Sequence, residues 1–501
     1  MIMTGLEAAF GYLLSPYGLL LMVIGTILGI TVGAVPGLTG AMLIALTLPL
    51  TFNMDPVAAF ILLVSMYVGA VSGGLITATL LRMPGTPASI MTTLDGYPMA
   101  KAGRPGRALG LGITASFVGG VISWLFLISV AKPIALYSTH LGPFDFFALV
   151  LLALVLIASV GGKSMSRSFF SAACGIFVSL PGVDKATGNL RLTFGFEELN
   201  GGLKLLPVLI GMFAISQVIS DISRIREKID VIPVKKRRDM LFRLEDWKKQ
   251  SMNLLRSSVI GTWIGILPGI GANIGSVTAY SAAKSVAKPD DQKKFGTGSE
   301  TAVVAAESAN NATIGGALIP MIALGIPGSV IDAILLGALL VHGLQPGPLL
   351  FQQNPTMVYT IMGTTLVSNI FMFAFMIFAV KYLARLATIP RGFLIPVILV
   401  FCIIGSYALS ARMFDVWTML IFGVIGFGFE RLKIPLAPFV IGFVLAPVAE
   451  ESLLTGLMAS NGSYLPLIQR PFSLLFVTLS VILLSLSIVK NYQARVSART
   501  H

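Results

Sequence analysis

The stretch GITVGAVPGLTGA, which runs from Gly29 to Ala41, decides the fold because the chain contains a second version of it. GTWIGILPGIGAN runs from Gly261 to Asn273 and keeps two glycines and a Pro-Gly pair at one constant separation. Further out, SGGLITATLLRMPGT (Ser72 to Thr86) recurs as GGALIPMIALGIPGS (Gly315 to Ser329). AGRPG, which starts at Ala102, recurs in the same order as HGLQPG. We interpret these ordered matches as an internal repeat.

The repeat divides the chain into five parts. An N-terminal segment (1–15) precedes the first repeat (16–220), and a connection (221–257) leads to the second repeat (258–490) and a tail (491–501). A polar insertion, KPDDQKKFGTG, explains why the second pair of matching stretches lies further apart than the first. Such repeats in a polytopic protein are typical of secondary transporters, in which the second half is commonly inverted in the membrane.

The composition predicts an all-α, polytopic transmembrane helix bundle. Of the 501 residues, 55% are hydrophobic and 11% are charged, against about 25% charged residues in a soluble domain. Apolar runs of spanning length recur from Pro16 to Val489. The runs are continuous, without the alternation of a β-barrel. The apolar excess also excludes a disordered chain or a coiled coil.

Basic residues concentrate in the connection from Asp221 to Ser257, which the positive-inside rule places in the cytoplasm. A patch for anionic lipid is an alternative, whereas nucleic acid is not expected because aromatic residues are scarce there. The tail carries Lys490 and Arg495, which favours a cytoplasmic C-terminus. The segment before Pro16 has no Lys or Arg, which favours an external N-terminus and no cleaved signal peptide.

Each repeat contains two Pro-Gly pairs inside apolar sequence, beginning at Pro36, Pro84, Pro268 and Pro327. Proline interrupts a helix and glycine allows the chain to reverse, so we expect broken or re-entrant helices. Peptide groups freed at membrane depth need partners. Free N–H groups suit a carboxylate, and free carbonyls suit sodium. The alternative is a plain kink or a loop at the membrane surface.

The residues around these breaks and one polar helix form the predicted site. ETAVVAAESANNAT begins at Glu300 and contains two amides and a carboxylate within about one turn; its counterpart in the first repeat is apolar, so the site is expected to be asymmetric. The substrate-binding candidates are Gly37, Thr39, Arg82, Gly85, Thr86, Ser89, Asn273, Asn310, Asn311, Gly328 and Ser329. The ion-binding candidates are Pro36, Gly40, Pro268, Gly269, Gly271, Glu307 and Asp332.

Each candidate has a structural alternative. Hydroxyls bond their own helix backbone, amides bridge helices, and Arg82 can extend to the membrane interface. Cys174 and Cys402 lie in apolar segments and suggest packing. No Walker loop, HExxH, GxSxG or zinc pattern occurs in the sequence. We therefore expect that ATP hydrolysis does not drive transport, that the chain is not an enzyme, and that it binds no cofactor and no metal ion other than sodium.

Several longer stretches resemble the large membrane subunit of the tripartite tricarboxylate transporter family. They include GAVPGLTGAM from Gly33, MPGTPASIMTTLDGYPMAKAG from Met83 and ESANNATIGGALIP from Glu307. LPGVDKATGNLRLTFGFEEL and VLAPVAEESL extend the resemblance over almost the whole chain. Arg82 stands where the family pattern suggests a small amide, and Leu454 where it suggests arginine.

The resemblance implies a permease of the bacterial inner membrane that works with a small membrane subunit and a periplasmic binding protein. It implies sodium-coupled import of a tricarboxylate or related carboxylate by alternating access, with elevator-like motion as a hypothesis. A self-sufficient organic-anion symporter is the alternative, followed by a passive anion channel. A conductance too large for a carrier, together with uptake that does not respond to a sodium gradient, would favour the channel.

Overall fold

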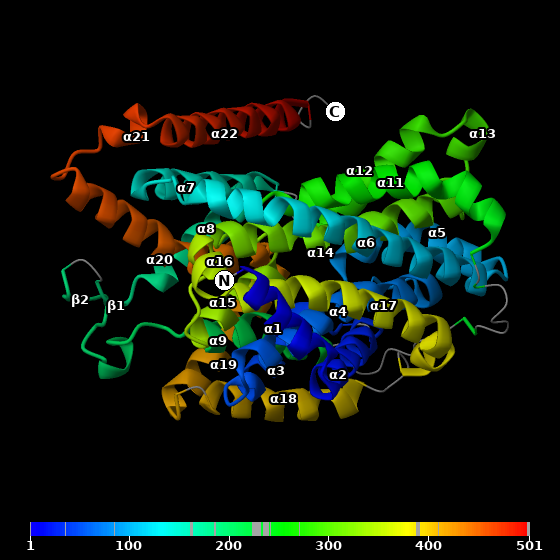
Figure 1. Cartoon of the computed structure of the whole chain (residues 1–501), viewed down its shortest axis with the longest axis horizontal. Helices are drawn as coiled ribbons and strands as arrows, with labels where there is room; N and C mark the ends of the chain where they lie inside the picture. The colour runs from blue at the N-terminus through cyan, green and yellow to red at the C-terminus, as the bar shows by residue number, and fades with distance from the viewer. Residues whose placement is uncertain are drawn as a thin grey trace.

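The computed structural model describes residues 2–35, 37–84, 86–160, 164–184, 187–222, 232–233, 240, 242–269, 271–386, 391–408 and 410–497. Nearly all of these residues are helical, and two short strands form one antiparallel hairpin. Eight of the described helical segments are long and apolar enough to cross a membrane. The predicted all-α polytopic bundle is therefore confirmed. In Figure 1 the long helices α4, α6, α14 and α17 lie along the long axis of the molecule.

The first half contains two short strands and helices of very different lengths. They are α1 (Ile2–Leu14), α2 (Pro16–Gly33), α3 (Gly40–Thr47), η1 (Leu48–Thr51), α4 (Pro56–Leu81), η2 (Pro87–Ser89), α5 (Ile90–Lys101), α6 (Pro105–Ser138), α7 (Pro143–Val160), α8 (Met165–Ser179), β1 (Gly182–Val183), β2 (Leu190–Arg191), η3 (Glu197–Leu199), α9 (Leu205–Leu209), the π-helical η4 (Ile210–Ile215) and α10 (Ser216–Ile222).

In the second half, helices are the regular secondary structure among the described residues. Its helices are α11 (Leu244–Ile266), α12 (Gly271–Val286), α13 (Pro289–Gln292), α14 (Glu300–Leu324), α15 (Val330–Val341), α16 (Pro348–Gln353), α17 (Pro355–Leu386), α18 (Arg391–Ala408), α19 (Met413–Arg431), α20 (Leu436–Ala459), α21 (Pro466–Gln469) and α22 (Pro471–Ser497). Helix α11 begins inside the connection assigned to 221–257, because Glu245 and Asp246 favour a helix N-terminus there.

Glycines let helices of the same half pack backbone against backbone, and the two halves do this alike. A Cβ on Gly29 of α2 would lie 2.4 Å from the carbonyl oxygen of Met66 in α4. A Cβ on Gly261 of α11 would lie 2.4 Å from the carbonyl oxygen of Ala309 in α14. Met66 and Ala309 are separated by the same number of residues as the repeated Pro-Gly pairs Pro84 and Pro327. The α2–α4 and α11–α14 pairs therefore share one packing register.

The repeat-related helices α4 and α14 run in opposite directions. The end of α4 and the start of α14 both meet α5, because Gly96 faces Thr79 and Asp95 accepts a hydrogen bond from the backbone N–H of Ser299. At the other end, Phe60 near the start of α4 packs against His342, which follows α15, and five residues further on Gly347 lies against Leu324 at the end of α14. Equivalent helices of opposite direction are the arrangement of an inverted repeat.

Replacing Gly29 or Gly261 by alanine is expected to lower thermal stability. The added methyl group would overlap a neighbouring backbone carbonyl, and overpacking of this kind costs about 1–3 kcal/mol. The matched control is Gly428→Ala in α19, since a Cβ there meets nothing within 4 Å. The melting temperature of each purified variant in detergent gives the answer. Equal melting temperatures for all three variants and the parent would contradict the close packing.

A second group of helices packs beside this core. Helix α20 lies against α7 and α8, α22 lies against α7, and α19 lies against η4. In Figure 1, α22 runs along one edge of the molecule, while the β1–β2 hairpin and α13 stand at opposite ends. The short helices α3 and α15 contact each other and the second group as well as their own half. The short helices α3 and α15, which follow two of the Pro-Gly pairs, thus lie where the two groups of helices meet.

Candidate substrate site

A cavity of about 210 Å³ lies at the meeting point of the two halves. Its lining comes from both repeats and from the second group of helices. The lining residues are Thr39, Gly40, Ala41, Tyr67, Val71, Thr86, Ala88, Phe213, Gly269, Gly271, Asn310, Ser329, Val330, Ile331 and Ala437. Seven of the predicted site residues, Thr39, Gly40, Thr86, Gly269, Gly271, Asn310 and Ser329, are therefore brought together from four distant parts of the sequence.

Four helical segments begin at the cavity wall. Thr39 and Ser329 are the N-caps of α3 and α15, Gly271 is the first residue of α12, and Thr86 immediately precedes η2, which leads into α5. The Pro-Gly breaks produce this arrangement by sending the chain back along the helix it has just left. Thr86 returns to the level of Gly74 in α4, and Gly328 returns to the level of Ala317 in α14.

Helix N-termini carry free N–H groups and partial positive charge, so they attract anions. The hydroxyl caps leave additional donors available. Thr39 Oγ1 accepts from the backbone N–H of Met42 at 3.2 Å, and Ser329 Oγ accepts from that of Asp332 at 3.4 Å. The Thr39 hydroxyl accepts in this contact, so its own O–H can be donated to a ligand, whereas the Ser329 hydroxyl also lies beside the Asp332 carboxylate and the Tyr67 hydroxyl. No Arg or Lys occurs among the described residues that line the cavity.

The lining residues form pairs related by the repeat. Thr86 and Ser329 are separated in sequence by the same distance as Pro84 and Pro327, and so are Tyr67 and Asn310. Thr39 and Gly271 are related in the same way as Pro36 and Pro268. The cavity therefore lies between equivalent residues of the two halves. The equivalent side chains are similar in the pair Thr86 and Ser329 and different in the pair Tyr67 and Asn310.

Asn310 is the polar side chain of the cavity whose hydrogen bonds are unmet. It is fully buried, and neither its amide nitrogen nor its amide oxygen makes a well-formed hydrogen bond in the described part of the chain, although the amide lies beside the Glu307 carboxylate of the same helix. Its equivalent, Tyr67, has its hydroxyl 3.4 Å from Ser329 Oγ. A buried amide without well-formed hydrogen bonds costs free energy that a bound ligand can recover.

Asp332 lies one turn beyond Ser329 in α15, behind the cavity wall. Its side chain is fully buried, and its carboxylate lies beside the hydroxyls of Ser329 and Tyr67 without a well-formed hydrogen bond among the described residues. The equivalent residue of the first half is Ser89, whose hydroxyl lies 2.8 Å from that of Thr86. At this position the two halves thus differ by one carboxylate, which stands on the α15 side.

The comparisons with known proteins agree with this architecture. The model of the tripartite tricarboxylate transporter TctA family matches residues 19–441. The chain belongs to this family. An Agrobacterium vitis relative, named "Uncharacterized 52.8 kDa protein in TAR-I ttuC' 3'region", is 32% identical over 487 residues, which cover 97% of this chain and 96% of the relative. No solved structure matches the chain.

A second relative covers half of this TctA-family chain. It is named "Uncharacterized protein in TAR-II ttuC' 3'region", also from Agrobacterium vitis, and is 29% identical over 235 residues, or 47% of this chain and 96% of the relative. The resemblance to the family found in the sequence is confirmed by the family match over most of the chain. The protein is thus a multi-pass membrane protein of a transporter family.

The structure places eight other predicted site residues of this TctA-family chain away from the cavity lining. Glu307 accepts hydrogen bonds from Thr92 and Ser116, and Asn311 accepts one from Ser72 at 2.6 Å. Arg82 is an exposed C-cap of α4, with its guanidinium 5.8 Å from the ring centre of Tyr97. The others are Gly37, Ser89, Pro268, Gly328 and Asp332. Pro36, Gly85 and the side chain of Asn273 lie outside the described residues.

Sequence reasoning missed Tyr67, Phe213 and Ala437. Extending the repeat alignment to Asn310 would have found Tyr67, because the two residues are equivalent. Phe213 and Ala437 come from η4 and α20, which pack against the core only through long-range contacts. Sequence reasoning also missed Asp95, which joins the halves: it accepts hydrogen bonds from Tyr280 and from backbone N–H groups of the loop before α14.

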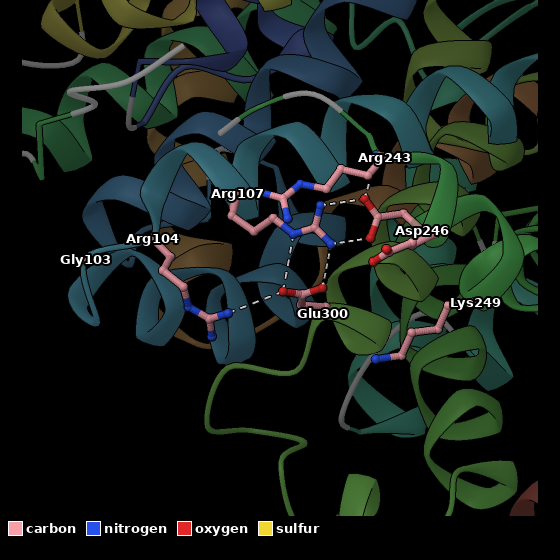
Figure 2. Close-up of a pocket in the computed structure, with 8 residues that line it drawn as sticks. Gly103, Arg104, Arg107, Arg243, Asp246, Lys249 and Glu300 are labelled. Carbon is pink, nitrogen blue, oxygen red and sulfur yellow. Dashed lines mark hydrogen bonds and ion pairs between the residues drawn. The ribbon is translucent and has the colours of Figure 1, made fainter. Parts of the chain in front are cut away.

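A charged cluster ties the halves together at the end of the molecule where α6 begins (Figure 2). Arg107 donates to Asp246 of α11 at 2.7 and 2.5 Å and to Glu300 of α14 at 2.7 Å. The Arg107 guanidinium lowers the pKa of Asp246, which lies in the first turn of α11, outside the candidate spans. With the contacts of Asp95 and Glu307, this cluster indicates that α5 and α6 are fixed to α11 and α14.

Proposed function

We propose that this chain is the large permease subunit of a sodium-coupled importer that carries a carboxylate through the described cavity. The single observation that supports it best is the buried amide of Asn310, which makes no well-formed hydrogen bond, in a cavity where four helical segments begin. Backbone N–H groups and hydroxyls there are hydrogen-bond donors for a carboxylate. The family further suggests a small membrane subunit and a periplasmic binding protein as partners, in the bacterial inner membrane.

The charges of the site support sodium coupling in this proposal. A carboxylate that enters a cavity without Arg or Lys brings negative charge into a low-dielectric region. Asp332, which is fully buried, adds a negative charge when ionised. A cation bound with the substrate balances both charges, and carboxylate, hydroxyl and freed carbonyl oxygens are suitable ligands for sodium. The cation site is therefore assigned to the start of α15, around Asp332 and Ser329.

Alternating access is supported by the fact that both groups of helices contribute residues to the cavity lining. Tyr67 and Asn310 come from the core helices α4 and α14, whereas Phe213 and Ala437 come from the second group. Sliding of one group along the other would expose the cavity first to one side of the membrane and then to the other. In this proposal the basic connection, residues 221–257, faces the cytoplasm.

Uptake into proteoliposomes tests the proposal. The purified chain is reconstituted with its small membrane subunit, and the binding protein loaded with radiolabelled citrate is supplied outside. We expect accumulation that needs an inward sodium gradient and stops when the gradient is collapsed. Equal uptake of free citrate by the chain alone would favour the self-sufficient symporter. Flux that ignores the gradient and never exceeds equilibrium would favour a channel and overturn the proposal.

A further inference from the structure

We propose that the external loop, residues 190–199, is the surface on which the soluble binding protein docks. The inference rests on the proposed function, because that function supplies the binding protein as a partner. It goes further by assigning the contact to one loop away from the cavity. Phe194 and Phe196 are its apolar contacts, and Glu197 and Glu198 are its charged contacts.

The external loop presents two aromatic side chains on its surface. Phe194 is 76% exposed and Phe196 is 60% exposed. Val183 and Leu190, which belong to the β1–β2 hairpin at the start of the loop, are about half exposed. Aromatic residues are enriched in protein–protein interfaces, where a few of them contribute most of the binding energy. The loop therefore has the apolar side chains that a docking surface needs.

Contacts with α20 hold the external loop in one conformation. Arg191 donates through both terminal nitrogens to the Glu450 carboxylate of α20, and its Nε donates to the Leu180 carbonyl at 2.7 Å. Leu192 and Phe194 have φ values of 51° and 50°, in the left-handed region that non-glycine residues adopt rarely. Such backbone conformations persist where the surrounding contacts fix them. A loop fixed in this way loses little conformational freedom when a partner binds.

The external loop lies at the end of the molecule that faces away from the cytoplasm in the proposed function. The β1–β2 hairpin stands at the end opposite α13 (Figure 1). The start of α11, which follows the basic connection, lies at the α13 end, because Asp246 there shares Arg107 with Glu300 at the start of α14 (Figure 2). Since the basic connection faces the cytoplasm, the loop faces the compartment that contains the binding protein.

Helix α20 connects the external loop with the cavity. Ala437, in its first turn, lines the cavity, and Glu450 of the same helix binds Arg191 of the loop. Glu450 follows Ala437 by 13 residues, which correspond to about 20 Å of helix. A transport site near the middle of the bilayer lies about 15 Å from the edge of the hydrocarbon core. The loop is therefore placed at or beyond that edge, within reach of a soluble protein.

The charges beside the aromatic residues favour a protein over the membrane surface as the occupant. Glu197 and Glu198 directly follow Phe196, both are exposed, and neither forms a salt bridge within the described residues. The nearby guanidinium of Arg412 donates to Asp415 and to the Glu198 carbonyl. Anionic lipid repels acidic side chains, whereas basic residues on a protein attract them and speed association. The docking face of the partner is therefore an apolar pocket with Lys or Arg at its rim.

Binding of the citrate-loaded binding protein to the full-length chain tests the assignment. The chain and its small membrane subunit are placed in phosphatidylcholine nanodiscs, and the affinity is measured by biolayer interferometry. Because truncating an aromatic anchor removes much of an interface's binding energy, we expect Phe194→Ala and Phe196→Ala each to weaken binding at least about tenfold. The matched control is Tyr464→Ala, since Tyr464 is also 60% exposed and lies just before α21. Parental affinity in both Phe variants would overturn the assignment.

Charge reversal separates a protein partner from a lipid surface. We expect the double variant Glu197→Lys, Glu198→Lys to slow association several-fold and to lose the salt dependence of the parent, because the attraction between unlike charges is removed. If the loop contacts lipid instead, the reversal leaves the affinity for the binding protein unchanged, and this result would overturn the assignment.

Citrate binding to the same variants, measured by calorimetry, separates docking from the cavity. We expect the parental affinity and the parental melting temperature, because the substituted side chains are exposed and the loop is about 20 Å from the cavity along α20. A parallel loss of citrate binding would overturn a role confined to docking. Failure of the binding protein to bind the parent chain would contradict the proposed function itself, whereas binding that the loop variants leave unchanged would overturn this inference alone.

Discussion

Replacing Asn310 by alanine is expected to abolish sodium-driven uptake while the protein still folds. The amide is buried in the cavity wall and makes no well-formed hydrogen bond in the described residues beyond its interaction with the neighbouring Glu307, so the folded state loses little when it is removed. A bound carboxylate or its neighbouring polar group loses a hydrogen bond worth about 1.5–3 kcal/mol, which corresponds to roughly 10- to 150-fold in affinity. Initial uptake rates in proteoliposomes and the melting temperature are measured side by side.

The neighbouring residue Asn311 is the matched control for Asn310. It accepts a hydrogen bond from Ser72 and donates one to the Glu307 carbonyl, and it does not line the cavity. Asn311→Ala is therefore expected to lower the melting temperature, because it leaves the buried Ser72 hydroxyl without this acceptor. Full uptake by Asn310→Ala, or a lower melting temperature for this variant than for Asn311→Ala, would contradict the assignment.

Replacing Asp332 by asparagine is expected to remove the sodium dependence of transport. The substitution keeps the size of the side chain and removes the charge that we assign to the cation. Uptake under an inward sodium gradient should then fall at least about tenfold, to the rate measured without sodium, because the neutral amide is a much weaker sodium ligand than a carboxylate. Initial rates measured over a series of sodium concentrations give the dependence directly.

Asp55→Asn is the control for this charge change. Asp55 is the N-cap of α4 and accepts hydrogen bonds from the backbone N–H groups of Val57 and Ala58. Asparagine caps helices about as well as aspartate, so stability and sodium dependence should remain as in the parent. An unchanged sodium response in Asp332→Asn would remove Asp332 from the cation site, and an equal loss in Asp55→Asn would show that the effect is not local.

The repeat motif made much of the site predictable. A Pro-Gly pair in apolar sequence interrupts a helix through its own local geometry, whatever the tertiary packing around it. The residue types that follow the pair can be read from the sequence. Thr39, Thr86, Gly271 and Ser329 could therefore be named, and they meet around one cavity. The predicted broken helices are confirmed for the same reason, since Gly328 lies beside Ala317 and Thr86 lies near Gly74.

Helical spacing alone could not predict which of the neighbouring polar residues of α14 faces the cavity and which faces another helix. Consecutive residues of an α-helix point about 100° apart, so Asn310 faces the cavity while Asn311 meets Ser72 and Glu307 meets Thr92 and Ser116. Which face of α14 meets which helix depends on tertiary packing. The same holds for Arg82, because its exposed position depends on the left-handed backbone with which α4 ends.

Labelling a cysteine inside the cavity tests the central claim most directly. Cys174 and Cys402 are the two native cysteines, so replacing both by alanine gives a background in which Ala88→Cys, in the cavity lining, is the sole thiol. A membrane-impermeant maleimide is applied to right-side-out and inside-out vesicles, with and without sodium and citrate. We predict labelling from both sides of the membrane, slowed when sodium and citrate are both present. Labelling from one side only, or at a rate that sodium and citrate leave unchanged, would contradict a substrate cavity with alternating access.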